Sequence, residues 1–128
     1  MERPIVLISD DEPLVVSALA RVAKREGLEP VGVARAEELH ETAARLQPSV
    51  IILDVRQPID GRDLLSALKA DPRTRDITVV VLSAVEDQFV RHTCFELGAR
   101  DYDVKPFDDG FMRKVLRLLA ESGRTSGA

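Results

Sequence analysis

The stretch Val50-Ile51-Ile52-Leu53-Asp54 is apolar for four residues and then ends on a carboxylate. Consecutive apolar residues that are rich in β-branched side chains are typical of a strand buried on both faces of a parallel sheet. In such sheets, ligands bind beyond the carboxyl ends of the strands, which is where Asp54 falls. This stretch therefore predicts both the kind of sheet and the edge at which its chemistry lies.

Similar apolar runs recur along the chain, at residues 5–8, 31–33, 77–82 and, more weakly, near 102–104. Between these runs the apolar spacing becomes helical, as in Val15, Ala18, Leu19 and Val22. The alternation predicts an α/β fold of the flavodoxin-like (βα)₅ type. This is a doubly wound parallel five-stranded sheet with helices on both faces.

Length and composition restrict the classes of protein that are possible. The 128 residues have room for one domain, which we place at residues 1–121, with a flexible tail at 122–128. A net charge of −4 offers no basic stripe for nucleic acid. The apolar run near the N-terminus is too short for a membrane span, and the lone Cys94 fits a reducing compartment. We expect a cytoplasmic domain without direct contact to nucleic acid or membrane.

Polar side chains follow four of the predicted strands. Asp10 and Asp11 come after the first, Asp54 after the third, Ser83 after the fourth and Lys105 after the fifth. In a parallel sheet these positions share one edge. Two carboxylates ~4 Å apart repel by roughly 4 kcal/mol at an effective dielectric constant of about 20. The cluster therefore predicts a bound cation or protonated carboxyls.

The types of side chain at this edge indicate the cation and the reaction. Oxygen ligands without His or Cys favour Mg²⁺ over zinc. Mg²⁺ sites are often completed by phosphate, and an ammonium and a hydroxyl nearby would meet phosphoryl oxygens. The set predicts a carboxylate nucleophile that attacks phosphorus and forms an aspartyl phosphate.

The chain resembles the receiver domains of bacterial two-component response regulators from residue 4 to about 121. The motifs that carry the resemblance are Ile5-Val6-Leu7-Ile8-Ser9-Asp10-Asp11-Glu12, Val50 to Asp54 with Pro58 and Asp60-Gly61 after it, Val79-Val80-Val81-Leu82-Ser83-Ala84, and Gly98-Ala99-Arg100-Asp101-Tyr102-Asp103-Val104-Lys105-Pro106-Phe107. Each motif is weak alone, whereas all of them in this order and spacing are specific.

The resemblance implies a role for each residue of the site. Asp54 would accept a phosphoryl group from a sensor histidine kinase or a phosphotransfer protein. Asp11, Asp54 and the backbone carbonyl of Arg56 would bind Mg²⁺ directly, and Asp10 would act through a metal-bound water. Lys105 would pair with a phosphoryl oxygen, and family members usually have a cis peptide bond after this lysine.

The resemblance also implies a switch. Ser83 would move to hydrogen-bond the phosphoryl group, and Tyr102 would turn inward as it does so. A downstream protein would then be contacted through the fourth helix, fifth strand and fifth helix, roughly residues 84–121. A homodimer is possible. The module would be no enzyme beyond its own phosphorylation and dephosphorylation.

The loop after Asp54 departs from the family pattern at two points. Gln57 stands where the family commonly has Met, and only Ile59 separates Pro58 from Asp60-Gly61, where two residues are usual. These departures leave the path of the loop open, but they leave the role expected of Asp54 unchanged.

Two other functions compete with this interpretation. A pseudo-receiver binds partners without phosphorylation, and such domains usually lack an acidic residue, the phosphoacceptor or the lysine. A phosphatase of the haloacid dehalogenase type also forms an aspartyl phosphate. That family needs an Asp-x-Asp motif after its first strand, which Ser9-Asp10-Asp11-Glu12 does not supply.

Overall fold

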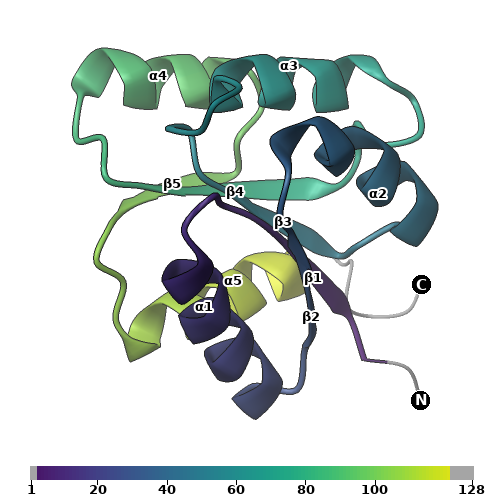
Figure 1. Cartoon of the computed structure of the whole chain (residues 1–128), viewed down its shortest axis with the longest axis vertical. Helices are drawn as coiled ribbons and strands as arrows, with labels where there is room; N and C mark the ends of the chain where they lie inside the picture. The colour runs from purple at the N-terminus through teal and green to yellow at the C-terminus, as the bar shows by residue number, and fades with distance from the viewer. Residues whose placement is uncertain (1–2, 122–128) are drawn as a thin grey trace.

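The computed structural model describes residues 3–121 and arranges them around a five-stranded sheet (Figure 1). The elements are β1 (Ile5–Ser9), α1 (Pro13–Arg25), β2 (Glu29–Val33), the short 3₁₀ helix η1 (Ala36–Glu38), α2 (Leu39–Leu46), β3 (Val50–Leu53), α3 (Gly61–Ala70), β4 (Thr78–Ser83), α4 (Gln88–Glu96), β5 (Asp101–Val104) and α5 (Asp109–Glu121). The strand order is β2-β1-β3-β4-β5, and all neighbours pair in parallel. The predicted (βα)₅ fold is confirmed. The predicted tail at 122–128 lies outside the described residues.

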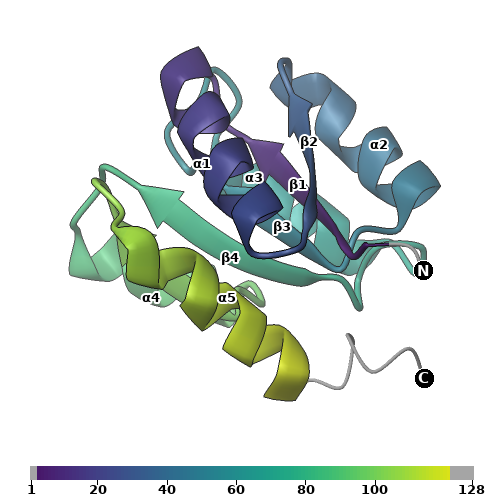
Figure 2. The ribbon, with the colours of Figure 1, turned by 90° about the horizontal axis from the view of Figure 1, so that it is seen from below.

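Two apolar layers hold the helices to the sheet. Helices α1 and α5 cover one face, and α2, α3 and α4 cover the other (Figures 1 and 2). Successive strand residues point to opposite faces, so Leu7 packs in the α2–α4 layer while Val6 and Ile8 pack in the α1–α5 layer. In β3, likewise, Ile51 packs in the α2–α4 layer and Ile52 packs in the α1–α5 layer. This explains why the strand sequences are apolar without alternation.

The register of the sheet brings the carboxyl ends of its central strands to one edge. Ser9, the last residue of β1, pairs with Leu53, the last residue of β3. The next residue along each strand is an aspartate, and the N–H of Asp54 donates to the carbonyl of Ser9 at 3.0 Å. Further along the edge, the N–H of Lys105 donates to the carbonyl of Ser83 at 2.8 Å. The site residues therefore share an edge because of strand pairing.

No helix among the described residues combines the length and the apolar composition that a membrane span requires.

Candidate functional site

The site is centred on two buried carboxylates at the edge of the sheet. Asp10 is 4% exposed and Asp54 is 3% exposed. Lys105, which follows β5, reaches both of them: its Nζ lies 2.8 Å from Asp10 Oδ2 and 3.2 Å from Asp54 Oδ2. Three residues, each directly after a strand, thus form one ionic cluster at the edge that the sequence predicted.

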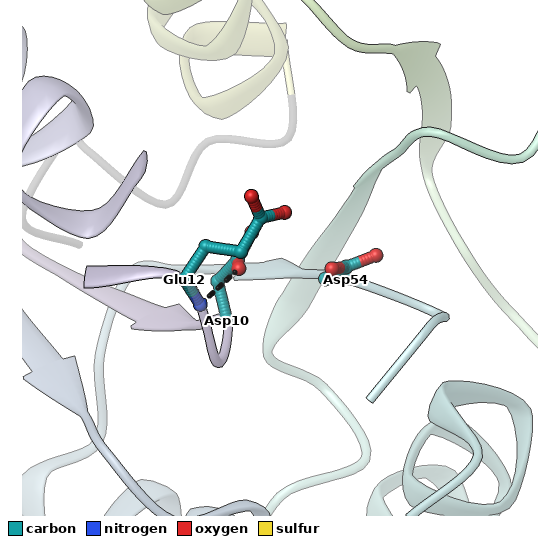
Figure 3. Close-up of side chains that lie close together, drawn as sticks. All are labelled: Asp10, Glu12 and Asp54. Atoms are coloured by element: carbon teal, nitrogen blue, oxygen red, sulfur yellow. Dashed lines mark hydrogen bonds between the residues drawn. The ribbon is translucent and has the colours of Figure 1, made fainter. Parts of the chain in front are cut away.

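A further carboxylate completes the cluster. Glu12 lies in the turn before α1, and its Oε1 is 3.0 Å from Lys105 Nζ. Ligand atoms of Asp10, Glu12 and Asp54 all lie within 4.8 Å of one another, so this group could hold a metal ion (Figure 3). Sequence reasoning gave Glu12 no role. No local pattern signalled it, because the chain bends at Asp11 and the Glu12 N–H donates to Asp10 Oδ1 at 2.9 Å.

Asp11 lies apart from that group. It is exposed and lines a groove between the N-terminal end of α1 and the end of β2, together with Ser17 and Ala34. The backbone at Glu12 is extended, with φ −97° and ψ 107°. Asp10 and Glu12 both contact Lys105, whereas Asp11, at the bend between them, is exposed.

Burial and charge set the protonation of the cluster. Burial raises the pKa of Asp10, and the neighbouring Asp54 carboxylate raises it further, against the lowering effect of Lys105. Burial alone would lower the pKa of Lys105, but the hydrogen bonds to Asp10 and Glu12 and the charge of Asp54 raise it overall. The Lys105 ammonium, which three carboxylates share, stays charged. It does not lower the pKa of Asp10 enough to offset the effect of burial on that pKa. The cluster keeps an excess of negative charge that a cation would neutralise.

The predicted switch residues lie beside the cluster. Ser83 is the last residue of β4 and is fully buried, and its Oγ accepts a hydrogen bond of 3.2 Å from the Val85 N–H. Tyr102 is 2% exposed, so its ring is already inward in this structure. Ser83 and Tyr102 thus both hydrogen-bond the backbone of Val85, in the loop that leads to α4.

The loop after Asp54 folds tightly back on the end of β3. The Arg56 N–H donates to Asp54 Oδ1 at 3.0 Å, and the Gly61 N–H donates to the Val55 carbonyl at 2.8 Å. A Cβ at Gly61 would lie 2.5 Å from the Val55 Cα, so this close return requires glycine. The Arg56 side chain is exposed and borders a groove with Arg62 and Val85.

The peptide bond between Lys105 and Pro106 is cis, as the resemblance implied.

Comparison with known proteins agrees with this geometry. The family model described as the response regulator receiver domain matches residues 6–117. The chain is 32% identical to the DNA-binding dual master transcriptional regulator RpaA of Synechocystis over 94% of this chain and 51% of that protein. It is 34% identical to the transcriptional regulatory protein PrrA of Mycobacterium tuberculosis over 96% of this chain and 53% of that protein. The chain thus spans about half the length of these curated relatives.

A solved structure gives the same result for the fold and the family. The signal receiver domain of a signal transduction histidine kinase from Syntrophus aciditrophicus superposes with a TM-score of 0.82 at 30% identity. The match covers 92% of this chain and 91% of that chain. From the family model, the curated relatives and this structure, the chain belongs to the family of response regulator receiver domains.

Proposed function

We propose that this domain accepts a phosphoryl group on Asp54 from a sensor histidine kinase or a phosphotransfer protein. The observation that carries the proposal is the position of the Lys105 ammonium, within hydrogen-bond distance of both Asp10 and Asp54. A buried carboxylate between a cation and further acidic ligands is suited to attack an electrophilic phosphorus. The relatives of this chain belong to a signalling family, in agreement with this proposal.

The donor set fits a bound Mg²⁺. Asp10, Glu12 and Asp54 offer only carboxylate oxygens, which are hard ligands, and Lys105 neutralises only part of their charge. By resemblance, Asp11 and the backbone carbonyl of Arg56 would also serve as ligands. When bound, the ion would neutralise charge on the transferring phosphoryl group. The residues that hold it would be Asp54, Asp11 and Arg56, with Asp10 acting through water and Glu12 within reach.

The residues of this chain have distinct tasks in the transfer. One oxygen of Asp54 forms a bond to phosphorus while the phosphorus–nitrogen bond of the donor's phosphohistidine breaks, and the electron pair returns to the imidazole. Lys105 meets an equatorial phosphoryl oxygen and stabilises its charge. The Ser83 hydroxyl accepts from Val85 in this structure and has its own proton free to donate to the phosphoryl group.

Helix α4 would respond to phosphorylation because it is hydrogen-bonded to the predicted switch residue Tyr102. The guanidinium of Arg91, on α4, donates to the Tyr102 carbonyl at 3.1 Å. Phe89, also on α4, is 72% exposed and is available to a partner. We infer that residues 84–121 contact a downstream protein or a second copy of the chain. RpaA and PrrA are transcriptional regulators, but the half of each that this chain matches would act through protein contact.

The test is phosphorylation by a small donor. Incubation with acetyl phosphate and Mg²⁺ should add one phosphoryl mass to the wild type and none to Asp54→Asn. Asp63→Asn, on the exposed side of α3, is the matched control and should be labelled fully. Chelation of Mg²⁺ should stop the reaction. Equal labelling of Asp54→Asn would refute the assignment. No labelling of the wild type would favour an interaction module that works without phosphorylation.

A further inference from the structure

The side chain of Gln57 joins the ends of two strands at the site. Its Nε2 lies 2.8 Å from the Asp54 carbonyl oxygen, 3.2 Å from the Ser9 carbonyl oxygen and 3.2 Å from Ser9 Oγ. Ser9 ends β1 and is fully buried, and Asp54 directly follows β3. A single amide group therefore links β1, β3 and the loop that leaves the phosphoacceptor.

Chemistry fixes the orientation of this amide. Two of its partners are backbone carbonyl oxygens, which only accept hydrogen bonds. With the amide reversed, its oxygen would lie against both carbonyls, and the two hydrogen bonds would be replaced by repulsion. The NH₂ group of Gln57 must therefore face the sheet, and a side chain without a donor cannot replace it.

These contacts restrain the backbone next to them. The planar peptide bond from Arg56 to Gln57 contains the Arg56 carbonyl, so anchoring Gln57 limits how that carbonyl can turn. On the other side of the same residue, the Arg56 N–H is held by Asp54 Oδ1 at 3.0 Å. Asp54 therefore holds the backbone on both sides of Arg56: its carboxylate binds the Arg56 N–H, and its carbonyl binds the side chain of Gln57. The short return to Gly61 leaves this loop few other paths.

We propose that Gln57 is a positioning residue of the metal site, which holds the Arg56 carbonyl ready as a ligand in this shortened loop. The inference rests on the proposed function, in which that carbonyl binds Mg²⁺. It gives one physical reason for both departures of this loop from the family pattern. The loop is one residue shorter, and Gln57 supplies a side-chain hydrogen-bond donor at the position where the family commonly has Met. A ligand that is already in place costs less free energy to order when the ion binds.

The test is a Mg²⁺ titration of the unphosphorylated protein, followed by calorimetry. Gln57→Met keeps the length of the side chain and removes the donor, and we expect its Kd for Mg²⁺ to rise about tenfold. Gln57→Asn keeps the amide but withdraws it by one methylene from the two carbonyls, so its Kd should rise about as much. The thermal midpoint of each variant is measured alongside. If Gln57→Met does not fold, Gln57→Asn alone decides the outcome.

A matched control exists elsewhere in the chain. The Nε2 of Gln47 also bridges two backbone carbonyls, those of Ala44 at 2.9 Å and Arg73 at 2.8 Å, away from the site. Gln47→Met should lower the thermal midpoint and leave the Mg²⁺ affinity unchanged. If the Gln57 variants behave as Gln47→Met does, the role of Gln57 is merely structural and the inference is overturned. A wild type that binds no Mg²⁺ overturns the proposed function as well, so the two failures are distinguishable.

Discussion

The hydroxyl of Tyr102 donates a hydrogen bond of 2.6 Å to the backbone carbonyl of Val85. This bond ties β5 to the loop between β4 and α4, and the Val85 N–H in turn donates to Ser83 Oγ. The sequence predicted that Tyr102 turns inward when Ser83 moves. In the structure the ring is already inward, so from this conformation the movement that remains belongs to Ser83 and the loop at Val85.

Removal of the Tyr102 hydroxyl should destabilise the protein. Tyr102→Phe keeps the buried ring but leaves the Val85 carbonyl without this donor, which should lower the free energy of unfolding by about 1 kcal/mol. Urea unfolding monitored by circular dichroism measures the change. Equal stability of the variant and the wild type would show that the bond contributes nothing to the stability of the fold.

Activation should act mainly on residues 84–121, the segment that contains Tyr102. Beryllofluoride, which mimics the phosphoryl group, should change amide hydrogen exchange more in residues 84–121 than in residues 13–47. The reason is that Ser83, Val85, Tyr102 and Arg91 form one chain of contacts from the site to α4. A uniform response along the chain, or none, would count against this path.

Asp11 and Lys105 should have opposite effects on Mg²⁺ binding. Asp11→Ala removes a predicted ligand, and its Kd for Mg²⁺ should rise at least about tenfold. Lys105→Ala should bind Mg²⁺ no more weakly than the wild type, because the ammonium occupies the same carboxylates of Asp10 and Asp54 and competes with the ion. Titration calorimetry compares the two variants. The reverse order of affinities would show that Asp11, exposed in this structure, is no ligand.

The side chain of Arg56 should slow the loss of the phosphoryl group. It is exposed at the mouth of the site, within two residues of Asp54, and its guanidinium stays charged. A contact to the phosphoryl group would shield phosphorus from water, so Arg56→Ala should dephosphorylate about threefold faster, the size expected for an exposed charge contact.

The decay rate at fixed Mg²⁺ tests this expectation, with the exposed Arg75→Ala as the control that should not change it. Slower decay of Arg56→Ala would mean that the guanidinium helps the transition state instead. An unchanged rate would make Arg56 a bystander.

A second ionic group affects the stability of the fold at low pH. The Arg73 guanidinium, the Arg73 N–H and His40 all hydrogen-bond Asp71 and lower the pKa of its carboxyl from the ordinary value of 3.8. Because the folded pKa lies below the unfolded one, the stabilisation is complete above that ordinary value. It is lost as the pH falls through the folded pKa.

Asp71→Asn should therefore be less stable than the wild type at pH 7, and the difference should shrink as the pH falls below about 4. Thermal unfolding across this range measures it. Asp76→Asn, an exposed position in the same loop, is the control. A difference between wild type and Asp71→Asn that is constant with pH would contradict the ionic origin of the effect.

The sequence determined the sheet and the position of Asp54 at its edge. Both follow from local patterns: an apolar run such as 50–53 needs burial on both faces, and a parallel sheet brings the residue after each run to one edge. Asp10, Asp54, Ser83 and Lys105 could be placed there without any knowledge of side-chain contacts. The sequence also showed that the loop after Asp54 is unusual, but not what the change does.

Tertiary structure decided which of these groups touch. Lys105 and Glu12 are 93 positions apart, and Gln57 and Ser9 are 48 apart, so no local pattern reports either contact. The bend at Asp11 was equally invisible, and beyond it Glu12 rather than Asp11 faces Lys105. Strand pairing fixes the edge, whereas side-chain partners depend on how the loops beyond that edge fold back over it, which is a property of the packed chain.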